Sequence, residues 1–289
     1  MEIGVTGATG GLGGRVARRL ADHGVAQRLL VRDAARAPDL EHAAVATFGG
    51  YDDAEGVRRA LEGIETLFLV SAAEDRDRVA LHRRMVDAVV AAGVRRIVYT
   101  SFVGAAPDCT FTFGRDHFHT EEHIKATGVG HTFLRDNLYL DFIPGLSSTE
   151  GVIRGPAGDG RVAAVARDDV ADVAVQVLVG EGHDGEAYDL TGAEAFTLAE
   201  AAEELSRASG RVITFEDETL EAARESRRPS GAAAFEIEGW VTSYAAIGAG
   251  DLEAVSDCVQ RFLDRPPARL GEWLRENPES YRHLLHPAA

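Results

Sequence analysis

The sequence predicts an α/β protein built on a doubly wound parallel sheet. The chain opens with a short apolar run, Ile3 to Val5, which a glycine-rich turn and a helical pattern follow at once. Apolar runs and helical patterns then alternate through the first half of the chain. The runs are continuously apolar, as expected when helices cover both faces of a parallel sheet.

Six strands are expected in this first half, at residues 3–5, 28–32, 45–48, 66–71, 96–101 and 131–135. Helical patterns separate them at about 13–23, 53–62, 75–92 and 115–127, and the longest carries an apolar stripe. Right-handed crossovers place the carboxyl ends of such strands on one edge of the sheet, where ligands bind.

The second half is less regular. Residues 151–156 and 161–165 predict a hairpin or two short strands, and Asp168 or Asp169 is expected to cap a helix reaching about residue 179. Thr197 and Glu200 have the spacing of a capping box at the start of another helix. Further elements are expected as strands near 188–192 and 212–215 and as helices at 218–228, 251–263 and about 270–277.

The glycine-rich turn predicts a site for the pyrophosphate of a dinucleotide. Gly7 can take the positive φ of a tight turn, Gly10 lets the backbone approach the phosphates, and Gly13 lets the helix pack close to the strand. The helix N-terminus then faces the anion. The spacing Gly7-x-x-Gly10-x-x-Gly13 differs from the commoner G-x-G-x-x-G, and glycine turns also serve purely structural needs. The predicted cofactor contacts here are Gly7, Ala8, Thr9, Gly10, Gly11, Leu12 and Gly13.

Arg32 predicts the phosphorylated form of the cofactor, NADP(H). An acidic residue usually ends the second strand where NAD is bound, whereas arginine pairs with a 2′-phosphate through two charged hydrogen bonds. Arg36 could assist, and Asp33 could instead bind the ribose of NAD.

Three more cofactor contacts are expected where strands end. Ser71 and Ala72 end the fourth strand and Ser101 ends the fifth, beside the expected nicotinamide, although serine also caps strands for structural reasons. Asn137 follows the sixth strand and is expected to border the nicotinamide side.

Composition excludes several other classes of protein. The net charge of −17 argues against nucleic-acid binding, which needs a basic face. No apolar run approaches the length of a membrane span, and no secretory signal is visible. Cys109 and Cys258 are far apart and have no metal or redox spacing, as expected for thiols of a cytoplasmic protein.

These motifs together resemble a known family. The run Thr6–Gly13, Val31-Arg32, Tyr99–Ser101, Leu134-Arg135 with Asn137, and Asp168–Ala171 are similar to the NmrA-like branch of atypical short-chain dehydrogenases, and most similar to the NADPH-dependent quinone oxidoreductase type 2 group. The resemblance implies a Rossmann domain, assigned to residues 1–150, and a smaller, intertwined carboxyl-terminal part, residues 151–289, with a substrate cleft between them. Some relatives reduce quinones or similar carbonyl compounds, and others bind the cofactor as redox sensors.

The chain departs from the wider superfamily in two places. It lacks the Tyr-x-x-x-Lys pair, and His117 with Glu121 stands at that spacing on one helix face. His117 is the candidate proton donor, although it could equally be a structural residue bonded to a carboxylate. Gly50 replaces an aspartate that holds the adenine in relatives, so Tyr51 or Asp52 would have to compensate. His119 and His123 have helical ligand spacing but no obvious third ligand, so no metal site is expected.

The expected function is an NADPH-dependent oxidoreductase that transfers hydride to a quinone-like or carbonyl compound. Electron-poor acceptors need little proton assistance, which suits a site without the tyrosine and lysine pair. The alternative is a non-catalytic NADP(H)-binding redox sensor. The expected partner is a small-molecule substrate, and neither nucleic acid nor a membrane is expected. The sequence is also compatible with a homodimer through the long helices.

Overall fold

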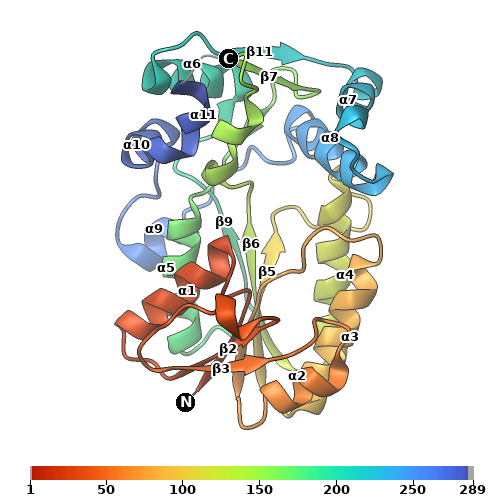
Figure 1. Cartoon of the computed structure of the whole chain (residues 1–289), viewed down its shortest axis with the longest axis vertical. Coiled ribbons are helices and arrows are strands. Elements are labelled where there is room, and N and C mark those ends of the chain that lie inside the picture. The colour runs from red at the N-terminus through yellow and green to blue at the C-terminus, as the bar shows by residue number, and fades with distance from the viewer. Residues whose placement is uncertain (1, 286–289) are drawn as a thin grey trace. The chain divides into compact units, whose positions relative to one another are not determined.

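The computed structural model describes residues 2–285 and contains a seven-stranded parallel sheet (Figure 1). The strand order is β3-β2-β1-β4-β5-β6-β9. The strands are β1 (Ile3–Thr6), β2 (Gln27–Val31), β3 (Ala43–Thr47), β4 (Thr66–Leu69), β5 (Arg96–Phe102), β6 (Gly130–Asp136) and β9 (Ala187–Leu190).

The chain reverses its direction of travel across the sheet at β1. Val5 lies opposite Leu29 of β2 on one side and Phe68 of β4 on the other, all in parallel register. This reversal is the topological switch point at which open α/β sheets bind ligands. The predicted doubly wound parallel sheet is therefore confirmed, with β9 as a seventh strand.

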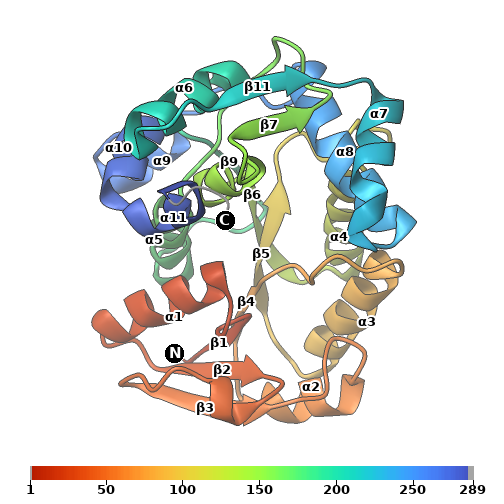
Figure 2. The same ribbon diagram turned by 45° about the horizontal axis from the view of Figure 1, so that its top comes forward.

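Helices cover both faces of this sheet (Figures 1 and 2). On one side lie α1 (Gly11–Asp22) and α5 (Arg167–Val179), and on the other α2 (Ala54–Ala60), α3 (Arg78–Ala91) and α4 (Thr112–Thr127). The core between the sheet and the second set includes the fully buried side chains Val57, Leu67, Met85, Ile97, Tyr99 and Ile124. Burial on both faces explains why the strands are continuously apolar.

Ion pairs join α1 to α5. Asp168 Oδ1 lies 2.7 Å from Arg19 Nη2 and its Oδ2 lies 3.1 Å from Arg15 Nε, while Asp172 Oδ1 lies 2.5 Å from Arg19 Nε. The prediction that Asp168 or Asp169 caps α5 is wrong, because the helix begins at Arg167 and both aspartates lie in its first turn. The two arginines of α1 engage the Asp168 carboxylate instead.

The chain forms two compact units. The first, here called the sheet unit, holds the residues up to Pro107, Asp116–Arg135 and Arg167–Asp189. The second, the carboxyl-terminal unit, holds Asp108–Arg115, Asp136–Ala166 and the chain from Leu190. The division of function at residue 150 between a cofactor part and a substrate part stays a prediction.

Two small sheets belong to the carboxyl-terminal unit. β7 (Val152–Gly155) pairs in parallel with β11 (Thr214–Asp217), and β8 (Arg161–Val162) pairs antiparallel with β10 (Phe196–Thr197). The two short strands predicted near 151–165 exist, but they form no hairpin because each one pairs with a strand more than thirty residues away.

The helices of this unit are α6 (Leu198–Ser209), α7 (Leu220–Arg227), α8 (Ala234–Gly248), α9 (Cys258–Leu263), α10 (Leu270–Glu276) and α11 (Arg282–Leu285). The Thr197–Glu200 capping box is present as predicted. The structure adds α8, and the helix predicted at 251–263 shrinks to α9. Short 3₁₀ turns lie at Ala34–Arg36, Leu140–Phe142, Pro144–Leu146, Arg228–Ser230 and Pro278–Tyr281.

Within residues 2–285, the helices are too short or too polar to cross a membrane.

Candidate cofactor site

The turn after β1 has the geometry that its glycines predict. Gly7 has a φ of 65°, and the Gly10 N–H donates to the Gly7 carbonyl at 2.8 Å to close the turn. A Cβ on Gly13 would lie 2.4 Å from the Gly7 carbonyl oxygen, so α1 can approach β1 this closely only with glycine there. The roles predicted for Gly7 and Gly13 in the backbone are thus present.

The first turn of α1 is open to an anion. Among the described residues no side chain caps the helix, whose N-cap is Gly10, and its first turn holds no acidic residue. Thr9, Gly10 and Gly11 are exposed, whereas Ala8 and Leu12 turn their side chains into the interior. Unpartnered N–H groups and the positive helix end suit a pyrophosphate, and a glycine cradle leaves room for it.

Arg167, the first residue of α5, brings a positive charge to this turn. Its Nη1 lies 3.2 Å from the position that a Cβ on Gly11 would take. No sequence pattern marks Arg167, because only the fold brings residue 167 beside residue 11.

Arg32 and Arg36 follow β2 as exposed side chains. Neither forms a hydrogen bond or ion pair through its side chain with the residues described. Asp33, the competing ribose ligand, already accepts a hydrogen bond from Ala35 N at 3.0 Å and caps the short turn that contains Arg36. The arginines therefore remain available for a phosphate.

The segment Val70–Ala72, here called the β4 exit segment, follows β4. Thr6 Oγ1 accepts from Val70 N at 2.8 Å, and the Tyr51 hydroxyl donates to the Val70 carbonyl at 2.5 Å. Ser71 N donates to Thr100 Oγ1 at 2.8 Å. Burial raises the pKa of Tyr51 to about 12. Its hydroxyl is thus used to hold this segment, which argues against the adenine contact considered for Tyr51.

A buried polar network lies between α3, β5 and α4. His117 Nε2 lies 3.2 Å from Arg78 Nη2, and its Nδ1 lies 3.0 Å from the Tyr99 hydroxyl. Arginine can only donate, so Nε2 of His117 accepts and its proton is on Nδ1. The pKa of His117 is held well below its usual value, mainly by burial and secondly by the positive charge of Arg78. Burial also raises the pKa of Tyr99.

This network leaves His117 neutral with both ring nitrogens engaged. The Glu121 carboxylate, which shares its helix face, is bound elsewhere: it accepts from Ser101 Oγ at 2.6 Å and from Arg135 at 2.6 and 2.9 Å. The catalytic role of His117 stays a prediction, and the contacts favour a holding role over proton donation.

Ser101 and Asn137 are more deeply engaged than expected. Ser101 is 3% exposed and uses its hydroxyl on Glu121. Asn137 is 2% exposed, donates to the Leu252 carbonyl at 3.0 Å and accepts from Leu138 N at 2.7 Å. Their direct contact with a cofactor stays untested, and their polar atoms already serve the fold.

His123 of α4 pairs with Asp87 at 2.8 Å. The residues described contain no group of three or more histidine, cysteine, aspartate or glutamate side chains arranged to hold a metal ion.

A family of dinucleotide-binding proteins matches this arrangement. The family model described as NAD(P)H-binding matches residues 7–181, which include the glycine turn and the whole seven-stranded sheet except β1 and β9. The chain therefore belongs to the NAD(P)H-binding family.

Individual relatives are reductases and oxidoreductases. The chain is 35% identical over 288 residues to a (4-alkanoyl-5-oxo-2,5-dihydrofuran-3-yl)methyl phosphate reductase of Streptomyces griseus, covering 96% of this chain and 98% of the relative. It is 26% identical over 282 residues to an NmrA-like oxidoreductase of Aspergillus flavus, covering 91% and 90%.

A solved structure supports the same placement. The NADPH-dependent quinone oxidoreductase of Escherichia coli, complexed with NADPH, superposes with a TM-score of 0.86 at 30% identity over 95% of this chain and 99% of that one. The predicted Rossmann-type fold, the NmrA-like and quinone oxidoreductase resemblance, and a nicotinamide-dependent oxidoreductase class are confirmed by these matches.

Proposed function

We propose that this oxidoreductase transfers hydride from NADPH to a quinone-like or conjugated carbonyl compound. The observation that carries the proposal is the uncapped glycine turn in the same unit as the free Arg32 side chain. Relatives named for an oxo-dihydrofuran phosphate and for quinones support a conjugated, electron-poor acceptor.

The main chain of Gly7–Gly13 would hold the pyrophosphate, with Arg167 beside it. Arg32, helped by Arg36, would hold the 2′-phosphate through charged hydrogen bonds. The Ser71 hydroxyl, which forms no hydrogen bond within residues 2–285, would face the nicotinamide half.

The bound dihydronicotinamide supplies a hydride. Around it the chain provides position rather than an acid, because His82 and His117 are neutral and Tyr99 holds its proton tightly. A reduced quinone oxygen can take its proton from water. The residues that the chain needs for this reaction are those that bind and orient the two reactants.

The direct test is oxidation of NADPH and of NADH by purified protein with a panel of quinones and conjugated lactones. We expect turnover that prefers NADPH. Tight coenzyme binding without turnover on any acceptor would contradict the enzyme and support a redox sensor.

Arg32→Asp tests the coenzyme preference. Losing the charged hydrogen bonds to the 2′-phosphate should weaken NADPH binding by roughly tenfold to a hundredfold and leave NADH binding nearly unchanged. Calorimetry with both coenzymes measures the change. Arg84→Asp alters the same charge on the exposed side of α3 and should change neither affinity; a preference unaltered by Arg32→Asp would contradict the role of Arg32.

We also infer that the protein acts in the cytoplasm, in keeping with its two free cysteines, Cys109 and Cys258. Light scattering of the purified protein would decide between a monomer and the homodimer that the sequence allows.

A further inference from the structure

Side chains hold the main chain of Ala72 at both of its polar groups. Ala72 N donates to His82 Nε2 at 2.8 Å, and the Ala72 carbonyl accepts from Arg78 Nε at 3.0 Å. Both anchors come from α3 and are buried, His82 at 0% and Arg78 at 6% exposure. Thr6, Tyr51 and Thr100 hold the neighbouring residues Val70 and Ser71. Together, these five side chains replace the strand-to-strand hydrogen bonds, which stop where β4 ends.

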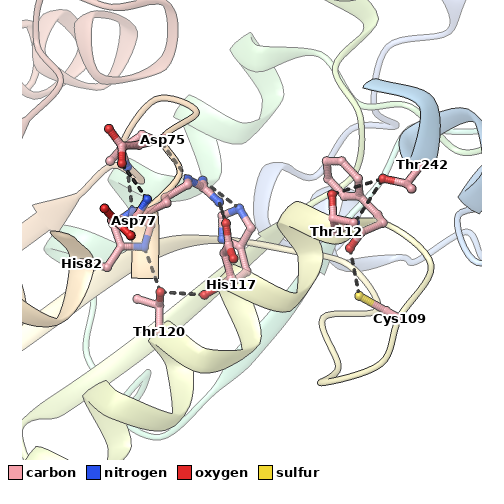
Figure 3. Close-up of polar contacts among 12 residues, drawn as sticks. Asp75, Asp77, His82, Cys109, Thr112, His117, Thr120 and Thr242 are labelled. Carbon is pink, nitrogen blue, oxygen red and sulfur yellow. Dashed lines mark hydrogen bonds and ion pairs between the residues drawn. The ribbon is translucent and has the colours of Figure 1, made fainter. Parts of the chain in front are cut away.

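The direction of each hydrogen bond fixes the state of His82. Its Nε2 accepts from a backbone N–H, so its proton is on Nδ1, which lies 2.8 Å from Thr120 Oγ1. The Thr120 hydroxyl donates a hydrogen bond to the Asp116 carbonyl at 2.7 Å. Figure 3 shows His82 and Thr120 facing each other along this chain of contacts. Burial, with help from Arg78, lowers the pKa of His82 to about 3, so the neutral ring persists at neutral pH.

Arg78 ties the same segment to α4. Besides Ala72, it contacts His117 Nε2 at 3.2 Å and lies 3.6 Å from Asp116 Oδ2. The planar guanidinium can donate in several fixed directions at once, which a lysine could not do. The β4 exit segment is therefore fastened to two helices of the sheet unit.

This fastening has a consequence for the cofactor. The N–H of Ala72 is used by His82 and its carbonyl already accepts from Arg78, so the partly exposed Ser71 hydroxyl is the side-chain group that this segment can offer to a ligand. Because the main chain around Ser71 is held, the Cα–Cβ bond that carries its hydroxyl is oriented before the ligand arrives, which lowers the entropy lost on binding.

We propose that His82 and Arg78 are positioning residues that fix the Ala72 peptide and thereby aim the Ser71 hydroxyl at the nicotinamide half of the coenzyme. This inference rests on the proposed function. It assigns a purpose to two buried, polar residues that touch neither the glycine turn nor the 2′-phosphate site.

Two substitutions of His82 separate its two contacts. Glutamine places its amide where Nε2 lies and can still accept from Ala72 N, whereas asparagine reaches only as far as Nδ1 and keeps the contact with Thr120 alone. Each variant leaves one buried hydrogen bond unmade, so the two are matched in the number of contacts that they lose. Only His82→Asn loses the Ala72 anchor.

The experiment measures binding of NADPH and of adenosine 2′,5′-bisphosphate, which lacks the nicotinamide half, and single-turnover hydride transfer to menadione. For His82→Asn we expect NADPH binding and hydride transfer to fall by roughly tenfold each, with fragment binding unchanged. His82→Gln should stay near the wild type in all three, as should His23→Asn, an exposed control.

Unchanged fragment binding shows that a variant is folded, so a general structural role would not produce this split. If both His82 variants fail to fold, Ser71→Ala tests the same idea, because it should weaken NADPH binding and leave fragment binding intact. Equal behaviour of the asparagine and glutamine variants, or an ineffective Ser71→Ala, would overturn the inference. If the wild type bound neither ligand, the proposed function would fall first.

Discussion

The glycine turn at Gly7–Gly13 and the β4 exit segment at Val70–Ala72 both follow strands of one sheet, but different atoms hold them. The turn is closed by its own main chain, and Gly13 lies so near Gly7 that there is no room for a Cβ on it. The exit segment is held by five side chains, from Thr6, Tyr51, Arg78, His82 and Thr100. The turn is thus held by residues that are close in sequence, whereas the exit segment is held by residues of β1, α3 and β5 and of the loop that carries Tyr51.

The difference determines how each region can fail. The glycine turn has no room for side chains at Gly13, so a larger residue there should disrupt it. The exit segment is held by hydrogen bonds from particular side chains, so removing one of those side chains should loosen it. Substitutions of opposite kinds should therefore affect the two regions.

The largest effect is expected from Gly13→Ala. The new Cβ would lie 2.4 Å from the Gly7 carbonyl oxygen and 2.6 Å from that of Thr6, so α1 would have to shift away from β1. We expect a loss of about 3 kcal/mol in the free energy of unfolding, measured by denaturant titration, and NADPH binding too weak to detect by calorimetry.

Gly145→Ala is the matched control, because nothing lies within 4 Å of its added Cβ and its φ is not positive. It should behave as the wild type does. Normal coenzyme affinity in Gly13→Ala would contradict the close helix and strand packing.

A smaller effect is expected from Tyr51→Phe, which removes a hydroxyl that holds the β4 exit segment. The Val70 carbonyl loses the hydroxyl that now lies at 2.5 Å, which should cost about 1 kcal/mol of stability. NADPH binding should weaken a few-fold, by the same loosening of the exit segment.

Tyr188→Phe is the comparison for this variant. The Tyr188 hydroxyl contacts His183 at 2.9 Å, so its loss should reduce stability without reducing NADPH affinity. The idea that side chains fasten the exit segment fails if both variants bind NADPH as the wild type does.

The smallest effect is expected from the ion pairs that join α1 to α5. Burial alone would raise the pKa of Asp168, but its hydrogen bonds and charge interactions with Arg19 and Arg15 outweigh burial and lower it. A carboxyl with a lowered pKa in the folded state contributes stability above its unfolded pKa of about 3.8, and that contribution is lost as the pH falls.

Melting temperatures of wild type and Asp168→Asn should therefore differ slightly at pH 7 and converge below about pH 4. Asp39→Asn, at an exposed site, should leave the melting temperature unchanged at both pH values. A gap that widens towards acid pH would contradict the assigned sign.

The contrast also explains what the sequence could reveal. Gly7 and Gly13 are recognisable from their local spacing, so the geometry of the turn was predictable, while the phosphate-binding role of Arg32 stays a prediction. Arg78, His82 and Arg167 act on residues far away or through main-chain atoms, so no local pattern marks them. Ser101 and Asn137 were placed at the correct strand ends, but sequence could not show that Glu121 and Leu252 already occupy their polar atoms.

Prediction of the helices and strands from sequence was limited in the same way. The alternating half was predictable because strands such as β1 and β4 are buried along their whole length and helical patterns separate the strands. Helix α8 was missed because its sequence, AFEIEGWVTSYAAIG, buries residues on several sides and carries no clear polar face. Its Gly239 packs so closely on Phe113 that a Cβ would lie 2.2 Å from the ring, a contact that only the fold creates.

Every substitution at Gly13 adds atoms, and none subtracts them. A mutagenesis library that spares the glycine codons of this turn, together with those of Arg32, Arg36, Arg167 and Ser71, should therefore retain coenzyme binding in most of its members. Variants selected for a new acceptor would then differ in acceptor handling rather than in the loss of their reductant.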